Sequence, residues 1–219
     1  MSRLGPFELD TIVVGDCLDV MRQMPDGCVD AVITDPPYGV HKASWDSEIP
    51  GAHVWMDIRR VLKRGGSLLV MCGLKYLPPT MTLLQEFLDY QWMFAWYKPN
   101  AMQFGKTGFS KLDVVLWYSK ERATAQTKKL DVIVEPIRVK ANKFGHPTPK
   151  PVPVMTHLIE CVTNPGDIIF DPFIGSGTTA VAAKKLGRHY FGCDINPEYV
   201  ELARQRVAKV DGVQLELLR

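Results

Sequence analysis

Four short apolar runs in this sequence are each followed directly by an aspartate. The runs have strand-like composition, and parallel strands end at one edge of their sheet, where the side chains that follow them meet. A single aspartate after a strand is commonly a turn or helix-cap residue. Four in the same register favour a site, and we expect their carboxylates to line one cleft. The runs are residues 11–15, 28–34, 167–170 and 189–193, and the acids are Asp16, Asp35, Asp171 and Asp194.

Strand-like and helix-like stretches alternate along most of the chain. This alternation predicts an α/β fold, with a doubly wound, Rossmann-like parallel sheet that carries helices on both faces. Residues 120–150 break the alternation and are rich in lysine and arginine, so we expect an insertion outside the sheet. The further strand-like runs are residues 67–72, 92–97 and 113–118, and the helix-like stretches include residues 54–64, 81–88, 178–186 and 197–210.

Length and composition predict a single globular domain and argue against a membrane protein, a metal site and a disulfide framework. With 219 residues, 46% of them hydrophobic, the chain is long enough for one domain over residues 1–219. No apolar run approaches the roughly 20 residues that cross a bilayer, and residues 1–10 lack the layout of a signal peptide, so we expect a cytoplasmic protein without membrane contact. The five cysteines and five histidines show no metal-ligand spacing, which predicts neither a metal site nor a disulfide framework. A net charge of +2 does not decide for or against nucleic acid.

Residues 171–179 follow a strand-like run and open a helix, with two glycines in the turn between them. Asp194 comes about 20 residues later at the end of the next run, where an acid can accept hydrogen bonds from ribose hydroxyls. The third glycine of the dinucleotide-binding pattern is absent, and Thr178 and Thr179 occupy that stretch. This disfavours a nicotinamide cofactor. The segment suits S-adenosylmethionine, which has an adenosine but no pyrophosphate. The positive groups of this cofactor favour nearby carboxylates, and its carboxylate suits a helix N-terminus.

The run at residues 28–34 leads into Asp35-Pro36-Pro37-Tyr38, which we interpret as the catalytic tetrapeptide. Two prolines fix two φ angles and remove two backbone donors, leaving a rigid corner that offers acceptors, namely the Asp35 carboxylate and the Pro36 carbonyl. Two acceptors that hold both hydrogens of an aryl amine localise its lone pair, so that the nitrogen can take a methyl group. Tyr38 supplies an aromatic face for a base rotated out of a duplex.

Taken together and in this order, the motifs resemble those of the amino-group DNA methyltransferases. Within that family, the chain is most similar to the circularly permuted beta group, in which the catalytic motif precedes the cofactor loop. The segments that carry the resemblance are residues 15–17, 35–38, 61–66, 146–151, 171–179 and 192–197. Pro149 departs from the family pattern, which more often has glutamine there.

The resemblance implies S-adenosylmethionine as cofactor and DNA as partner. It implies Asp16 and Cys17 at the adenine end of the cofactor, Asp194 at its ribose, and Lys150 with the 171–179 loop at its methionine end. Because the tetrapeptide begins with aspartate rather than serine, the resemblance favours N6 of adenine over N4 of cytosine. The expected cofactor-binding residues are Asp16, Cys17, Lys150, Asp171, Pro172, Phe173, Gly175, Ser176, Gly177, Thr178, Thr179, Asp194, Ile195 and Asn196.

Two basic stretches are candidates for target recognition, the loop at residues 98–111 and the insertion at residues 120–150. Basic residues interleaved with aromatics suit phosphate contact and base stacking. Both stretches are short for this family, which implies relaxed sequence specificity or a homodimer that completes the grip on DNA. A bacterial or phage origin is expected, in a restriction–modification or a solitary role. The lysines proposed to contact DNA are Lys98, Lys106, Lys111, Lys140 and Lys143.

Rival functions stay open at this point. N4 of cytosine, an RNA base or a protein amide could use the same two acceptors. A nucleotide-binding oxidoreductase would leave the tetrapeptide without a role, and a non-catalytic binding module would not need Asp35 or the glycine loop. Methylation at carbon 5 of cytosine is excluded, because that reaction needs a cysteine nucleophile and the sequence has no Pro-Cys pair.

Overall fold

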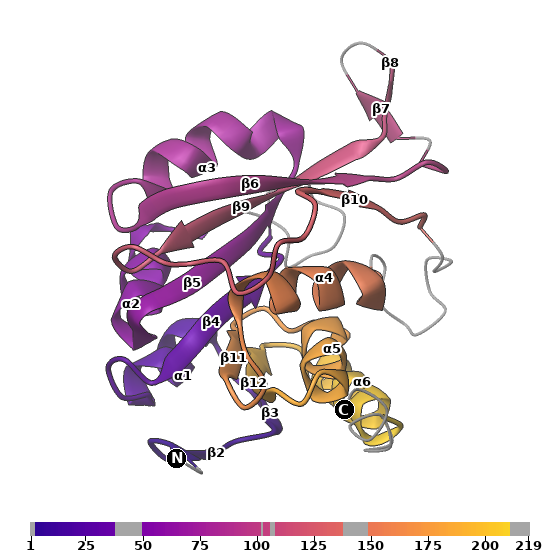
Figure 1. Ribbon diagram of the computed structural model, residues 1–219. Helices are drawn as coiled ribbons and strands as arrows, with labels where there is room; N and C mark the ends of the chain where they lie inside the picture. Colours follow the sequence, from indigo (N-terminus) through magenta and orange to yellow (C-terminus); the bar gives the residue numbers. More distant parts are fainter. Residues whose placement is uncertain (1–2, 38–49, 102, 106–107, 138–148, 211–219) are drawn as a thin grey trace.

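A computed structural model describes residues 3–37, 50–101, 103–105, 108–137 and 149–210. In this part of the chain, eight strands form one sheet in the order β10-β6-β9-β5-β4-β11-β12-β3 (Figure 1). Their bounds are β3 Thr11–Val14, β4 Val29–Thr34, β5 Leu62–Cys72, β6 Asp89–Tyr97, β9 Leu112–Ser119, β10 Val132–Val134, β11 Ile168–Asp171 and β12 His189–Asp194. Two short antiparallel pairs lie outside this sheet, namely β1 Arg3–Leu4 with β2 Phe7–Glu8, and β7 Gln103–Gly105 with β8 Gly108–Ser110.

The sheet is mixed rather than wholly parallel, which corrects the sequence-based prediction. Strand β9 runs antiparallel to both β5 and β6, while the other neighbours in the sheet pair in parallel. The reason lies between β6 and β9, where the antiparallel pair β7–β8 stands and the described residues contain no crossover helix.

Helices cover both faces of the sheet, as the alternation predicted. One face carries α1 (Cys17–Gln23), α2 (Ala52–Val61) and α3 (Leu77–Leu84), and its core includes the fully buried Trp55 and Phe170. The opposite face carries α4 (Val152–Val162), α5 (Thr178–Lys185) and α6 (Pro197–Ala208). Strand β4 is buried on both faces, which explains its nearly continuous apolar sequence. No helix among the described residues is both long and apolar enough to cross a membrane.

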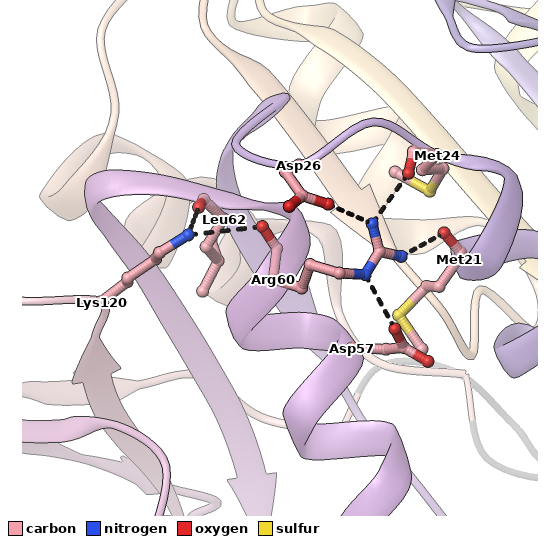
Figure 2. A network of polar contacts seen from close by, with 7 residues as sticks. All are labelled: Met21, Met24, Asp26, Asp57, Arg60, Leu62 and Lys120. Atoms are coloured by element: carbon pink, nitrogen blue, oxygen red, sulfur yellow. Dashed lines mark hydrogen bonds and ion pairs between the residues drawn. The ribbon is translucent and has the colours of Figure 1, made fainter.

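Arg60 joins α1 to α2 at the amino end of the sheet (Figure 2). Its guanidinium group donates hydrogen bonds to the carbonyls of Met21 and Met24, at the end of α1, and forms ion pairs with Asp26 and Asp57. Lys120 lies at the same end of the sheet, where its Nζ donates to the Leu62 carbonyl at 2.8 Å and to the Arg60 carbonyl at 3.3 Å. Arg60 and Lys120 therefore satisfy backbone carbonyls at the end of α1 and at the junction of α2 with β5, and they tie these elements together.

Several element boundaries differ from the prediction. The helix expected at residues 54–64 ends at Val61, and Leu62–Arg64 already belong to β5, where Gly65 turns the chain with a positive φ of 74°. The helix expected at residues 81–88 starts earlier, at Leu77, because Pro78 and Pro79 occupy its first turn. Helices α1 and α4 and the one-turn 3₁₀ helix Leu74–Tyr76 were not predicted.

The predicted insertion at residues 120–150 is only partly outside the sheet. Within it, Val132–Val134 form strand β10, which pairs in parallel with the end of β6 and becomes the edge of the sheet. An edge strand of three residues lacks the longer hydrophobic pattern that identifies a strand in a sequence. Residues 138–148 of this stretch lie outside the described residues.

Candidate functional site

The four aspartates that follow the strands meet in one pocket. Thr34, the last residue of β4, pairs with Val70 of β5, and Asp171 and Asp194 end the neighbouring strands β11 and β12. Asp16, Asp35, Asp171 and Asp194 all line a single pocket at this edge of the sheet. The prediction that the four carboxylates line one cleft is therefore confirmed. A pocket with this lining suits a ligand with positive charge.

Asp171 is the buried hub of the pocket, with 3% of its surface exposed. Its Oδ1 accepts hydrogen bonds from Thr34 Oγ1 at 2.8 Å and from the Phe173 amide at 3.1 Å, while its Oδ2 accepts from Thr179 Oγ1 at 2.7 Å. Burial raises the pKa of Asp171 to about 7, although these three donors act in the opposite direction. The carboxylate thus connects the end of β4, the loop after β11 and the first turn of α5.

Asp194 holds the first glycine of the loop in place. Its Oδ2 accepts from the Gly175 amide at 3.0 Å, and its Oδ1 accepts from the Asn196 amide at 2.9 Å. Burial raises the pKa of the Asp194 carboxyl. A carboxylate oxygen can accept more than one hydrogen bond, so both oxygens retain acceptor capacity towards a ligand in the pocket.

Two of the residues predicted to bind the cofactor have structural roles, and their contact with the cofactor stays a prediction. Asn196 does not line the pocket; its side chain caps α6 by accepting from the Glu198 amide at 2.8 Å. Gly177 also lies off the lining, with a positive φ of 79°, and a Cβ there would lie 2.6 Å from the Cβ of Ala203. Glycine is required at this position because α6 packs directly against the loop.

The remaining cofactor residues expected from the sequence do line the pocket. Asp16 caps α1 by accepting from the Leu18 amide at 2.8 Å, so it fulfils the helix-cap role as well. The Cys17 thiol beside it is buried, which raises its pKa to about 12 and keeps it protonated. The full set that the pocket shares with the prediction is Asp16, Cys17, Lys150, Asp171, Pro172, Phe173, Gly175, Ser176, Thr178, Thr179, Asp194 and Ile195.

Sequence reasoning missed residues that reach the site from helices. Met155 of α4 and Tyr199 of α6 line the pocket, and Gly15 and Pro149 lie there too. Arg206 of α6 lies behind the loop, where its Nη1 donates to the Ser176 hydroxyl at 2.7 Å and to the Thr178 hydroxyl at 3.2 Å. The position of Tyr199 in the first helical turn after Asp194 offered a signal, but nothing local marked Met155 or Arg206.

Asp35 and Lys150 both line the pocket, and the Asp35 carboxylate is ion-paired with the ammonium group of Lys150. The two side chains are 24% and 18% exposed. Pro37 lines the pocket beside them, Pro36 does not, and Tyr38 lies outside the described residues. The family resemblance implied Lys150 at the methionine end of a cofactor, and the structure gives it the Asp35 carboxylate as a partner that was not predicted.

Lys98 is not available to a phosphate, which corrects the prediction for this residue. Its side chain is 4% exposed, and its Nζ forms an ion pair with Asp113 of β9 at 2.7 Å and lies 5.4 Å from the centre of the Trp96 ring. Lys111 is half-buried and donates to the Pro99 carbonyl at 2.8 Å. Lys106, Lys140 and Lys143 lie outside the described residues.

The first half of the 120–150 stretch lies away from the pocket. Lys120 follows β9 at the amino end of β5, and Lys129 is ion-paired with Glu160 near the end of α4. Helix α4 starts at Val152, beside Lys150, so its rise of about 1.5 Å per residue separates Glu160 from the pocket by more than two turns. Among the described residues, no group of three or more His, Cys, Asp or Glu side chains forms a metal site.

Sequence comparison relates the chain to enzymes that modify DNA. A sequence model of the DNA methylase family, which covers N6 and N4 methyltransferases, matches residues 29–205. The chain is 28% identical to the Type II methyltransferase M1.MboII of Moraxella bovis, over 90% of this chain and 96% of that protein. It is 28% identical to the Type II methyltransferase M.HpaI of Haemophilus parainfluenzae, over 90% of this chain and 73% of that protein.

Solved structures share the fold. The M1.HpyAVI–SAM complex superposes with a TM-score of 0.75 at 25% sequence identity, covering 90% of this chain and 98% of that one. The cytosine-N4-specific PvuII DNA methyltransferase superposes with a TM-score of 0.73 at 19% identity, covering 89% of this chain and 85% of that one. At 19% identity, the second likeness bears on the fold alone.

Proposed function

The chain belongs to the DNA methylase family of amino-group methyltransferases, and from this premise we propose that it methylates the N6 amino group of adenine in DNA. Its cofactor is S-adenosylmethionine, in keeping with the family and with the M1.HpyAVI–SAM complex. The observation that carries the proposal is the place of Asp35, which follows β4 and lines the same pocket as Asp16, Asp171 and Asp194. A base that enters this pocket meets the carboxylate and the cofactor together.

The pocket residues fit S-adenosylmethionine by their chemistry. The carboxylates of Asp16, Asp171 and Asp194 suit a ligand that carries a sulfonium and an ammonium group, and Asp194 suits ribose hydroxyls in particular. Phe173 and Ile195 offer apolar surface to an adenine ring, and the buried start of α5 suits a carboxylate. When bound, the cofactor supplies an electrophilic methyl group.

The residues of this chain act on the amino group that receives the methyl group. We propose that the Asp35 carboxylate and the Pro36 carbonyl accept one hydrogen each from N6, which localises the nitrogen lone pair. The positive charge that develops on the nitrogen is stabilised by the carboxylate, and the proton leaves afterwards. Tyr38 would stack on the flipped base. Aspartate at the head of the tetrapeptide and the order of the motifs support adenine and the permuted beta group.

DNA contact is proposed for the loop at residues 98–111 and for the second half of the 120–150 stretch. Figure 1 shows the β7–β8 hairpin projecting beyond the ends of β6 and β10, on the side of the sheet where α4 begins. Asn100 ties this loop to the end of β10 through two hydrogen bonds with the backbone of Ile137, at 2.9 and 2.8 Å. Lys106, Lys111, Lys140 and Lys143 remain the proposed phosphate contacts.

A transfer assay with a panel of acceptors tests the proposal. The protein is incubated with methyl-labelled S-adenosylmethionine and with double-stranded DNA, single-stranded DNA, RNA or protein, and labelled DNA is then digested to nucleosides. We expect label in N6-methyl-2′-deoxyadenosine from DNA. Label in N4-methyl-2′-deoxycytidine would overturn the choice of base while keeping the family chemistry, and label in RNA or protein alone would overturn the proposed substrate.

A further inference from the structure

A tight turn follows the end of β6. The Ala101 amide donates to the Lys98 carbonyl at 3.0 Å, and Pro99 and Asn100 lie at the centre of the turn that this bond closes. Proline is favoured at the second position of such turns because its φ is already set, and asparagine is common in turns. Lys98 is itself anchored by its ion pair with Asp113 of β9. The turn therefore holds Asn100 at a defined place beside the sheet.

The chain that leaves β10 is held beside the end of β6. The two strands pair in parallel as far as Val134 and Tyr97. Beyond this pair, the Glu135 amide donates to the Tyr97 carbonyl at 3.2 Å, and the indole N–H of Trp96 donates to the Glu135 carbonyl at 2.8 Å. The second of these bonds is buried, so the end of β10 is fixed to the core of the protein.

Prolines interrupt the backbone pairing on both chains after this point. Pro99 and Pro136 lack the N–H that would continue a ladder of hydrogen bonds. The Asn100 side chain replaces the missing backbone groups, because an amide side chain has both a donor and an acceptor, as a peptide group has. Its Nδ2 donates to the Ile137 carbonyl at 2.9 Å, and its Oδ1 accepts from the Ile137 amide at 2.8 Å. One side chain thus extends the contact between the two chains past the end of the sheet.

Asn100 and Ile137 belong to the two segments for which DNA contact is proposed. Asn100 lies in the 98–111 loop, which includes β7 and β8, and Ile137 precedes Lys140 and Lys143 in the chain. Both hydrogen bonds are exposed to solvent. Exposed hydrogen bonds contribute little to the free energy of unfolding, because water competes for the same groups. The two bonds therefore bear on the relative position of the segments more than on the stability of the fold.

We propose that Asn100 is a positioning residue for DNA recognition, because its amide holds the 98–111 loop and the chain at Ile137 in one fixed arrangement. This inference rests on the proposed function, and it holds for adenine and cytosine targets alike. A fixed arrangement reduces the conformational freedom that is lost when DNA binds. The benefit should be larger for the sequence that the enzyme methylates than for other DNA, because non-specific binding depends mainly on charge.

The test compares two variants that break the same contact from opposite sides. Asn100→Ala removes both hydrogen bonds, and Ile137→Pro removes the amide donor while it leaves Asn100 intact. The variant with both substitutions completes a double-mutant cycle. Asn164→Ala is the matched control, since Asn164 is an exposed asparagine whose Nδ2 donates to Gln126 Oε1 at 3.1 Å, before the start of β11 at the opposite end of the sheet.

DNA affinity is measured with two duplexes, one that contains the sequence methylated by wild type and one that lacks it. For Asn100→Ala, we expect the affinity for the first duplex to fall by about threefold to tenfold, and the affinity for the second to change by less than about twofold. Ile137→Pro should lose a similar amount, and the double variant should lose no more than either single variant. Asn164→Ala should match wild type.

Two further measurements separate positioning from other roles. Cofactor affinity, measured by calorimetry, should stay within about twofold of wild type in every variant. Hydrogen exchange of the Ile137 amide is followed in the absence of DNA, and Asn100→Ala should accelerate it by about tenfold or more. If Asn100→Ala does not fold, Asn100→Leu is subjected to the same measurements.

Additive losses in the double variant would make Asn100 a direct DNA contact and would overturn the proposal. An Ile137 amide that exchanges in wild type as fast as in an unstructured peptide would also overturn it, and this measurement needs no variant. If wild type methylates DNA and Asn100→Ala binds both duplexes as wild type does, the inference fails and the proposed function stands. If wild type methylates no DNA, both fail.

Discussion

The edge of the sheet at which β4, β11 and β12 end has two halves, which we assign to the cofactor and to the target base, and they are built differently. On the cofactor side, Thr34, Asp171 and Thr179 are at most 3% exposed and satisfy one another with hydrogen bonds. On the target side, Tyr97, Leu112 and Val134 end or begin β6, β9 and β10 with 37%, 38% and 64% of their surface exposed. The cofactor side is thus preorganised by buried polar bonds, whereas the target side offers apolar surface to a partner. Asp35 lies at the junction of the two halves.

The largest effect on the cofactor side is expected from Gly177→Ala. The substitution forces a side chain into a left-handed backbone position and against Ala203, at a combined cost of about 2–5 kcal/mol in the free energy of unfolding. Denaturant unfolding and cofactor titration measure it, and both stability and affinity should fall. Gly166→Ala is the control, since Gly166 also has a positive φ but has nothing within 4 Å of its Cβ position. Equal losses in the two variants would show that packing against α6 does not matter.

A second prediction concerns pH and the buried hub. Because the pKa of Asp171 is raised to about 7 in the folded protein, its contribution to stability is fully present below about pH 4 and is lost as the pH rises through about 7. The change amounts to a few kcal/mol, on the order of the shift itself. Asp171→Asn should flatten this dependence of the free energy of unfolding. Parallel pH curves for wild type and variant would contradict the role of Asp171.

A third prediction concerns the loop support that the sequence did not reveal. Arg206→Met removes the hydrogen bonds to the hydroxyls of Ser176 and Thr178 but keeps the apolar stem, so we expect cofactor affinity to fall by roughly tenfold, or about 1.4 kcal/mol. Calorimetric titration measures the change. An unaltered cofactor affinity would show that the loop holds its shape without the hydrogen bonds from Arg206.

The smallest effect is expected on the target side. Lys111→Ala should weaken DNA binding severalfold and lower the salt dependence of the binding constant by about one unit of slope, while cofactor affinity is unchanged. DNA titrations at several salt concentrations measure this. Lys129→Ala serves as the control at the far end of α4. If both variants lose DNA affinity equally, the assignment of the target side is wrong.

Much of the cofactor side could be predicted from the sequence because its signals are local. Strand ends followed by aspartate, and a glycine turn that opens a helix, carry their structural meaning within a few residues. The burial of Lys98 could not be predicted, because its partner Asp113 is brought alongside by the pairing of β6 with β9. For Asn196, the helix-cap and cofactor roles share one sequence pattern, and the structure shows the helix cap.

The central claim is that Asp35 acts on the target amine, at the junction of the two halves, and not on the cofactor. Asp35→Ala tests it most directly, with the single-turnover rate of methyl transfer to DNA and the cofactor dissociation constant measured on the same preparation. We predict that transfer falls by about three orders of magnitude or more, while the cofactor dissociation constant changes by less than about threefold. A loss of cofactor binding that accounts for the lost transfer would contradict the claim.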